Sequence, residues 1–212
     1  MSASSGHALF LAAGSAVSFP THPGVLVSTQ PPGAPPALVV ADILAGLPRR
    51  LAHVRAVAAK AERISDRLDN PADRQLLVDS AWFHDVGYAA PLVETGFHPI
   101  DGARWLFRVG GSDRLCGLVA HHLCAEVGAG LRGLADVIAH FDNERSDLTA
   151  LLAWCDLTTG PGGEDRGLDE RLADIRSRYG QDHVVCQAWR TAEPVARELF
   201  TRVGHTGQLG WP

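Results

Sequence analysis

Lysine is almost absent from this sequence: Lys60 is the only lysine among its 19 basic residues. The 24 acidic residues outnumber the basic ones, and the net charge of -5 gives no bulk attraction to nucleic acid polymers or to an anionic membrane. No apolar run approaches the roughly 20 residues of a membrane-spanning helix. A Gly-rich phosphate loop of the Walker or Rossmann kind is also missing, so phosphate binding would depend on other groups.

Cysteine is scarce as well, and none of the cysteines shows Cys-x-x-Cys spacing. The four are Cys116, Cys124, Cys155 and Cys186. Disulfides and zinc ligation are the alternatives, but three of the four fall inside apolar helical patterns, which favours reduced, buried thiols. Residues 8–17 are mildly hydrophobic but have no basic region before them, which argues against a secretory signal. We therefore expect a cytoplasmic protein.

The first 40 residues differ in composition from the rest of the chain. They are rich in proline, glycine, serine and alanine, and no charged residue occurs before Asp42. Such a segment has no helical period, so we expect residues 1–40 to be a flexible leader, or translated sequence upstream of the true start. The length of 212 residues favours one domain with appendages. We expect that domain over residues 41–165, with C-terminal helices over 166–212 packing on the same bundle.

Helical periodicity runs through most of the chain after Asp42. Leu51, Val54, Ala58 and Ala61 recur at three- and four-residue spacing and predict a helix over residues 49–67. No segment alternates apolar and polar residues as a strand would. The sequence therefore predicts an all-α bundle. Further helices are expected from the cap at residues 70–73 to the stop at Gly87, and at about 98–109, 113–122 with Asp113 as cap, 147–159, 168–179 and 181–203, with a loop over 88–97 and an irregular stretch over 131–143.

The most informative segment is Ala81-Trp-Phe-His84-Asp85-Val-Gly87. A carboxylate has two oxygens and can bridge two metal ions while the neighbouring imidazole binds one of them. Further potential ligands surround this doublet in sequence: His53, His98, the pair His121-His122, and Asp156. This ordered set of histidines and aspartates predicts a dinuclear metal site.

Residues of about 47–160 resemble the HD superfamily, the all-helical metal-dependent phosphohydrolases, in the subgroup with two additional histidines after the His-Asp doublet. The similar segments are His53-Val-Arg-Ala-Val-Ala, Phe83-His84-Asp85-Val-Gly87, His98-Pro-Ile-Asp-Gly102, Leu118-Val-Ala-His121-His122 and Leu152-Ala-Trp-Cys-Asp156. Their order along the chain is that of the family. Many members carry a lysine directly after the glycine of the doublet, and this chain has Tyr88 there, so no role of that lysine transfers.

The resemblance implies a ligand set for two divalent metal ions, with Asp85 as the bridge. One ion would be bound by His53, His84, Asp85 and Asp156, and the other by Asp85, His98 and His121. Neighbouring residues on a helix point about 100° apart, so His121 and His122 cannot both face one ion. The spacing of the family favours His121 as the ligand, and His122 would then face the substrate or support a ligand. His98 has a second interpretation as a simple helix cap.

The residues that contact substrate are harder to predict. Arg55 and Arg104 lie near His53 and His98 in sequence and are the candidates for phosphate contacts, beside Asp85 and His122 in the catalytic set. Tyr88 and Glu94 lie on the loop after the doublet, where the pocket mouth is expected, and Glu94 is a candidate base or extra ligand.

Three functions are compatible with this pattern. The resemblance favours a metal-dependent phosphohydrolase that cleaves a phosphate ester of a small metabolite or nucleotide with a metal-bound hydroxide. The first alternative is an HD-type diiron oxygenase acting on a small organic substrate, since the same ligands suit Mn, Fe or other ions. The second is a ligand-sensing module in which the metal site is structural. The hydrolase is favoured because it needs little beyond two Lewis-acidic ions and one or two cationic partners.

Overall fold

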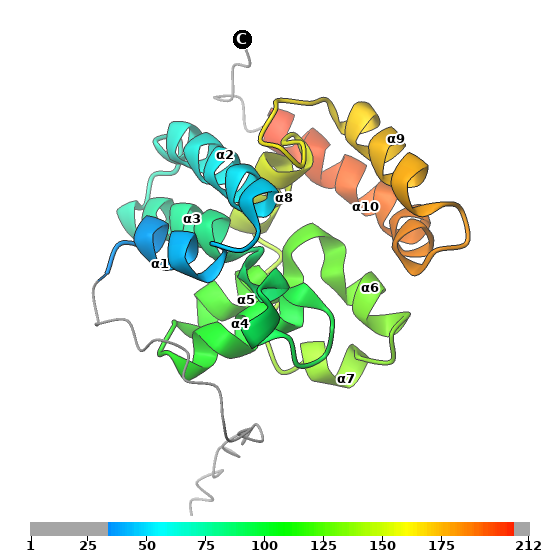
Figure 1. The fold of residues 1–212 in the computed structure, drawn as a ribbon. Coiled ribbons are helices and arrows are strands. Elements are labelled where there is room, and N and C mark those ends of the chain that lie inside the picture. Colours follow the sequence, from blue (N-terminus) through cyan, green and yellow to red (C-terminus); the bar gives the residue numbers. More distant parts are fainter. Residues whose placement is uncertain (1–33, 206–212) are drawn as a thin grey trace, which may run out of the picture.

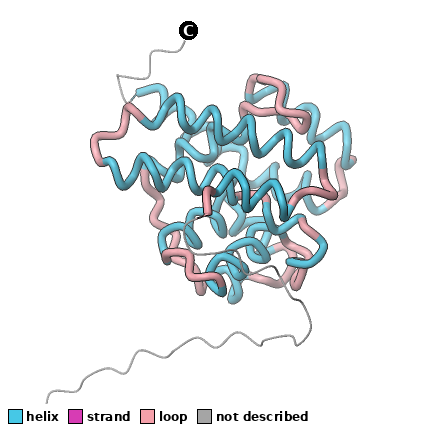
Figure 2. Tube along the Cα trace, turned by 60° about the vertical axis from the view of Figure 1, so that its left-hand side comes forward, coloured by secondary structure: helices cyan, strands magenta, loops and turns pink. Residues whose placement is uncertain are grey.

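The structure, a computed structural model, describes residues 34–205, which fold into a bundle of α-helices (Figure 1). The all-α prediction is confirmed. Within this described range no segment forms a strand, and one isolated β-bridge joins Thr159 and Asp165. The tube view in Figure 2 shows helices joined directly by loops. No helix of residues 34–205 is both long and apolar enough to span a membrane.

The helices begin and end close to the predicted positions. Their bounds are α1 Pro36–Ile43, α2 Pro48–Ser65, α3 Pro71–Phe83, α4 His98–Arg108, α5 Asp113–His121, α6 Ala125–Gly130, α7 Ala135–Ile138, α8 Asp147–Leu157, α9 Leu168–Tyr179 and α10 Val184–His205, with 3-10 turns η1 Val86–Tyr88, η2 Ala90–Leu92 and η3 His122–Cys124. Pro48 and Pro71 occupy first-turn positions, where a missing N–H costs nothing.

Side-chain caps fix several helix starts. The side chain of Asn70 accepts a hydrogen bond from the backbone N–H of Ala72 at 2.9 Å, and that of Ser112 accepts from Leu115 N at 3.3 Å. Ser112, rather than the predicted Asp113, is therefore the N-cap of α5, because its hydroxyl reaches the free N–H groups of the first turn. The stretch predicted as irregular, 131–143, contains the single turn of α7, and the predicted loop 88–97 contains the 3-10 turn η2 and the last residue of η1.

The predicted leader extends too far into the folded chain. Residues 36–40 belong to α1, whose Val40 is fully buried, as is Leu44 just after the helix. The proline run supplies the first turn of this helix, and the apolar residues after it pack on α2 and α3. The rest of the predicted leader, residues 1–33, lies outside the described residues.

The bundle is organised around α8. Helix α2 packs against α3, and α8 contacts both of them and α10 (Figure 1). Fully buried Val57 and Ala61 of α2 meet Leu77 of α3 and Leu152 of α8 in one core cluster. On the other side, α4 packs on α5 and on η1. This arrangement brings the end of α3, the start of α4, the end of α5 and the end of α8 towards one point.

Candidate metal centre

Six histidine and aspartate side chains from five parts of the chain converge at that point. Two groups are formed, and in each the ligand atoms lie within 4.8 Å of one another: His53, His84 and Asp156 in the first, and Asp85, His98 and His122 in the second. His98 is partly exposed and the other five are buried. Imidazole nitrogens and carboxylate oxygens in this arrangement are a donor set for divalent transition metals.

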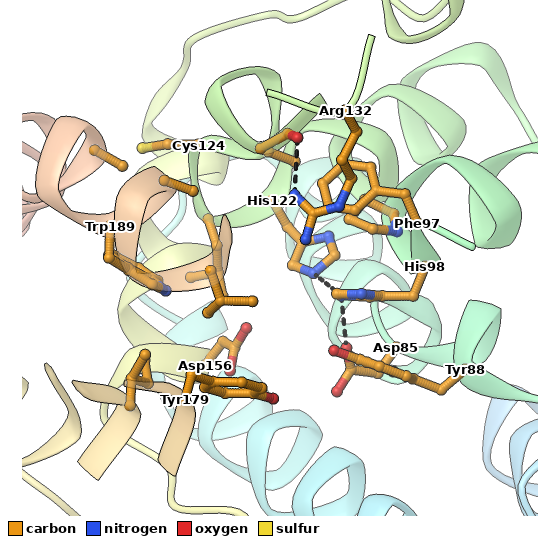
Figure 3. A pocket seen from close by; sticks show the side chains of 18 of the residues that line it. Asp85, Tyr88, Phe97, His98, His122, Cys124, Arg132, Asp156, Tyr179 and Trp189 are labelled. Carbon is orange, nitrogen blue, oxygen red and sulfur yellow. Dashed lines mark hydrogen bonds and ion pairs between the residues drawn. The ribbon is translucent and has the colours of Figure 1, made fainter. Parts of the chain in front are cut away.

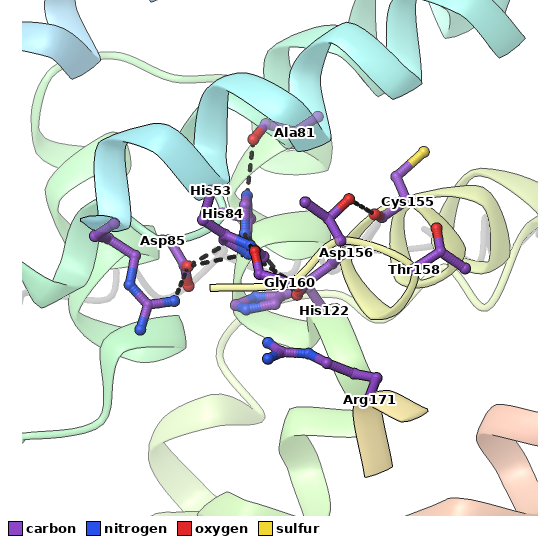
Figure 4. A network of polar contacts seen from close by, with 12 residues as sticks. His53, Ala81, His84, Asp85, His122, Cys155, Asp156, Thr158, Gly160 and Arg171 are labelled. Atoms are coloured by element: carbon purple, nitrogen blue, oxygen red, sulfur yellow. Dashed lines mark hydrogen bonds and ion pairs between the residues drawn. The ribbon is translucent and has the colours of Figure 1, made fainter. Parts of the chain in front are cut away.

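Backbone carbonyls fix the orientation of three of the imidazoles. The Nδ1 atoms of His53 and His84 lie 2.9 and 2.7 Å from the carbonyl oxygens of Gly160 and Ala81 (Figure 4). The Nδ1 atom of His122 lies 2.6 Å from the carbonyl oxygen of Val119. A nitrogen that faces a carbonyl must carry the proton, so in each neutral ring the Nε2 atom is left with a lone pair. Each of these lone pairs is available to a metal ion, as in known histidine–metal sites.

The Nε2 atoms of the centre face one another at short distances. The Nε2 atoms of His53 and His84 are 3.4 Å apart, and Nε2 of His98 is 3.3 Å from Nε2 of His122. Oδ1 of Asp156 is buried without a hydrogen bond, although Nε2 of His53 lies 3.1 Å away. Facing acceptors repel unless a cation or a proton lies between them. The residues therefore fit divalent metal ions.

The ionisation of the centre reflects the same need for positive charge. Burial opposes the charge of Asp85, yet Arg50 and His84 hold the pKa of its carboxyl well below the usual range. Burial also favours neutral His84, but the two carboxylates raise its pKa to about 9. For His122, burial and the neighbouring His98 and His84 lower the pKa to about 4. Without a metal ion, a proton on His84 supplies the charge that the carboxylates require.

Asp85 lies between the two groups. Its Oδ2 atom is 3.3 Å from Nε2 of His84 and 3.7 Å from Nε2 of His53, and its Oδ1 atom is 3.2 Å from Nε2 of His98. One oxygen thus faces each group. This is the position that a bridging carboxylate requires.

The choice of His121 over His122 is wrong in this structure. Nε2 of His121 lies 2.8 Å from the carbonyl oxygen of Phe141, and its Nδ1 atom is 3.7 Å from Glu126, so the ring turns away from the centre. The helical argument holds, because only one of the two rings faces the centre; the choice of His121, which rested on the spacing of the family, is the part that is wrong. His122 follows the last residue of α5, and its Nε2 atom lies 3.3 Å from Nε2 of His98.

Close backbone packing holds the His-Asp turn against α4. A Cβ atom on Gly87 would lie 2.1 Å from the carbonyl oxygen of His98 and 2.6 Å from the backbone nitrogen of Gly102. Only a glycine allows this approach, which fixes His98 beside Asp85. The glycines of the two segments, Gly87 and Gly102, are thus explained by contact between their backbones.

Arg50 is a residue of the site that the sequence did not single out. Its Nη1 atom donates to Oδ2 of Asp85 at 2.5 Å, and its guanidinium lies 4.0 Å from the centre of the Tyr88 ring. The other face of Tyr88 stacks on His98, with ring centres 4.0 Å apart. Arg50 lies three residues before His53 on α2. This spacing places both residues on one helix face, and it could have identified Arg50 as a residue of the site from the sequence. Tyr88 lies at the site as predicted, sandwiched between a cation and a candidate ligand.

A pocket of about 300 Å³ opens onto the centre (Figure 3). Asp85, His98, His122 and Asp156 form part of its lining, and the opposite wall comes from α9 and α10. Four arginines line it, Arg50, Arg132, Arg171 and Arg178. The only carboxylates among its lining residues are the two of the metal centre, so the pocket favours an anionic ligand.

Arg171 is the most notable of these arginines. Its side chain is buried, and its Nε and Nη1 atoms have no hydrogen-bond partner. Asp174 lies 3.5 Å from Nη1, as an ion pair without a hydrogen bond. Figure 4 shows the guanidinium directed towards the metal centre. Buried N–H groups without partners are costly, and an anion bound at the centre would satisfy them.

The predicted phosphate-binding arginines lie elsewhere. Arg55 is exposed on α2 and does not line the pocket, because its position on the helix directs it outwards. Arg104 lies outside the pocket too, where its Nη1 atom donates to Glu94 at 3.2 Å. Glu94 also accepts from Arg108, so it is neutralised by two arginines and faces no metal ligand. None of these three predicted roles is supported.

Lys60 supports the centre from a distance. Its buried Nζ atom donates to the carbonyl and hydroxyl oxygens of Thr158, each at 2.8 Å, and to Asp165. These bonds hold both ends of the loop that follows α8, and the carbonyl of Gly160 in that loop accepts from His53. The single lysine thus fixes the loop that orients a candidate ligand.

Comparison with known proteins agrees with this geometry. The family model described as HD domain matches residues 50–176, more than half of the chain, and this range contains all six converging residues. Searches of curated proteins and of solved structures found no match. HD domains are in general metal-dependent hydrolases of all-α fold. The sequence match and the converging histidines and aspartates agree, and the chain belongs to the HD domain family.

Proposed function

We propose that this protein is a metal-dependent phosphohydrolase that cleaves a phosphate ester of a small metabolite or nucleotide at a dinuclear centre. The observation that supports this proposal is one arrangement: two groups of metal-ligand atoms adjoin a pocket that four of their six residues, Asp85, His98, His122 and Asp156, and four arginines line. Metal ions and guanidinium groups are two kinds of cation that bind phosphoryl oxygens in proteins.

His53, His84 and Asp156 would hold one ion and His98 and His122 the other, with Asp85 shared by both. Bound there, two divalent cations would lower the pKa of a coordinated water and neutralise charge on the phosphoryl oxygens.

The protein's own residues have separate tasks. Arg171 has free N–H groups directed at the centre and would bind the phosphoryl oxygens as negative charge develops on them. Arg50 donates to Asp85 and holds its carboxylate in the position between the two groups. Tyr88 packs against both Arg50 and His98, and its ring lies nearly parallel to that of His98.

The alternative of an HD-type diiron oxygenase uses the same donor set, because imidazole and carboxylate suit iron as well as manganese. The arginines of the pocket favour the hydrolase. A phosphate ester carries the charge that they would neutralise, whereas activation of dioxygen needs no such group. A sensing module with a structural metal is less favoured, because a structural site is usually closed and this centre opens onto a pocket.

The test begins with protein purified without oxygen, whose metal content is measured. Protein loaded with manganese, iron or another divalent ion is then assayed for release of inorganic phosphate from a broad panel of phosphomonoesters and nucleotides. We expect release with at least one ion, and its loss in Asp85→Ala. The control is Arg55→Gln, which changes an exposed arginine outside the pocket. No release across the panel, together with substrate-dependent oxygen consumption by the iron form, would favour the oxygenase.

A further inference from the structure

The pocket wall that faces the metal centre has an unusual composition. Residues of α9 and α10 supply an apolar surface that includes Ile175, Ala188, Trp189 and Ala192. The lining as described contains no serine, threonine, asparagine or glutamine. Sugar hydroxyls and base edges are normally recognised by such side chains. The organic part of a ligand in this pocket would therefore meet mostly apolar groups, aromatic rings and guanidinium groups, with the hydroxyls of Tyr88 and Tyr179 beside them.

Arg132 provides a cation on a different wall from Arg171. It follows α6, its Nη1 atom donates to the carbonyl of Gly128 at 2.8 Å, and its guanidinium lies 4.6 Å from the centre of the Phe97 ring. Within residues 34–205 no carboxylate lies within ion-pair distance of it. The carbonyl and the ring fix the orientation of the guanidinium at the pocket (Figure 3). For its other N–H groups the described residues provide no hydrogen-bond partner, so these groups are available to an anion.

The lining of the pocket carries more positive charge than one bound phosphate would neutralise. Its only carboxylates, Asp85 and Asp156, belong to the metal-ligand groups. Asp174 balances Arg178, at 2.7 Å, and only loosely Arg171. Arg171 is directed at the centre and accounts for the reacting phosphate, so Arg132 remains without an anion.

We propose that the substrate is a small organic phosphate with an apolar body and a second anionic group, and that Arg132 binds this second group. The inference rests on the proposed function for the first phosphate. A carboxylate and a second phosphate share the chemistry that a guanidinium recognises, since both accept two parallel N–H bonds. Sugar phosphates with a single anionic group would be poorer ligands, because outside the metal-ligand groups Tyr88, Tyr179 and Trp189 are the few neutral side chains of the lining that could bond several hydroxyls.

The experiment uses phosphonates, which are not hydrolysed, so that binding is measured apart from turnover. Isothermal titration of metal-loaded protein compares propylphosphonate with 3-phosphonopropionate, and phenylphosphonate with 4-carboxyphenylphosphonate and 1,4-phenylenebisphosphonate. We expect at least one ligand with two anions to bind roughly tenfold or more tightly than its partner with one, the effect of one charge-assisted hydrogen bond. The carboxylate and bisphosphonate members identify the preferred second anion. A hydroxylated analogue, 2,3-dihydroxypropylphosphonate, should bind no more tightly than propylphosphonate.

Variants assign the effect to residues. Arg132→Gln should remove the advantage of the second anion and leave the affinity for phenylphosphonate within about twofold, whereas Arg171→Gln should weaken every phosphonate. Arg55→Gln should change none of these affinities. Equal affinity within every pair, or an advantage that survives Arg132→Gln, would overturn the inference. If the preference depends on Arg132 and yet no ester of the panel releases phosphate, the inference stands and the proposed hydrolysis fails.

Discussion

The contact between Gly87 and the first turn of α4 leads to a sharp prediction. In Gly87→Ala the new Cβ atom would begin 2.1 Å from the His98 carbonyl oxygen and 2.6 Å from Gly102 N. Both neighbours are backbone atoms, so no side chain can rotate away. The turn and the helix must separate by about 1 Å or more to reach ordinary contact. That separation would also carry His98 away from Asp85.

The expected cost follows from these distances. Overpacking of a well-packed site costs about 1–3 kcal/mol, and a clash with rigid backbone belongs at the upper end. The lower chain entropy of unfolded alanine returns about 0.4–1 kcal/mol. The net loss of unfolding free energy is therefore about 2 kcal/mol. Metal–ligand distances tolerate only about 0.2 Å of change, so the ion held by Asp85, His98 and His122 should also be lost.

Urea denaturation of the metal-free protein measures the stability, and elemental analysis after dialysis against metal measures the bound ions. Gly46→Ala is the control, because a Cβ atom there meets nothing within 4 Å. Full metal content together with a stability change below about 0.5 kcal/mol in Gly87→Ala would refute the reasoning.

Three further predictions concern the centre and its support. Lys60→Met should lower the unfolding free energy by about 2 kcal/mol and the metal affinity roughly tenfold or more, because the loop that orients His53 loses its charge-assisted bonds. Denaturation measures the first effect and competition with a metal-binding dye the second, and an unchanged metal affinity would show that this loop does not support metal binding. Elemental analysis should find one ion fewer in His122→Ala and no loss in His121→Ala, and the opposite pattern would restore the choice made from sequence. Chelation of the metal should lower the melting temperature, because the facing histidine and aspartate acceptors would lose the cation between them, and added metal should restore it. A melting temperature that is the same with and without metal would mean that these acceptors need no cation.

Much of the fold could be predicted because its signals are local. Capping and periodicity predicted both ends of α9 at the observed residues, and they predicted the end of α4 within one residue of its observed position. The short α1 was missed because its eight residues follow a proline-rich segment and carry no charge before Asp42. Its helical state depends on burial of Val40 against α2 and α3, which is a tertiary effect that periodicity does not record.

The ligands of the site could also be predicted from local patterns, but its arginines could not. Five of the six predicted ligands lie in the two converging groups, since each belongs to a short segment with its own pattern. The arginines could not be chosen in this way. Arg55 and Arg104 were selected by closeness in sequence, whereas Arg171 reaches the centre from a helix that follows the last ligand by a loop. Which of many arginines faces a pocket depends on how α9 packs, and no local pattern encodes that.

The orientation of the histidines links the metal centre to the ends of the helices. His84 and His122 are the C-cap residues of α3 and α5, and each Nδ1 atom meets the carbonyl three residues before it, in Ala81 and in Val119. Carbonyls in the last turn of a helix have no partner within that helix, so the helix end supplies an acceptor at no cost. The negative ends of the two helix dipoles also point towards the proposed cations.

His53 lies in the interior of α2, where the carbonyls before it already accept helical hydrogen bonds. It therefore needs an acceptor from outside its helix, and the carbonyl of Gly160 provides one. That loop has to be held in place by other means, which explains why the only lysine of the chain is buried against Thr158. The ring of a histidine at a helix end is thus oriented by a carbonyl of its own helix, whereas a histidine inside a helix needs an acceptor from a second structural element. By this reasoning the ligand of α2 is the one whose geometry is most sensitive to substitutions far from the centre.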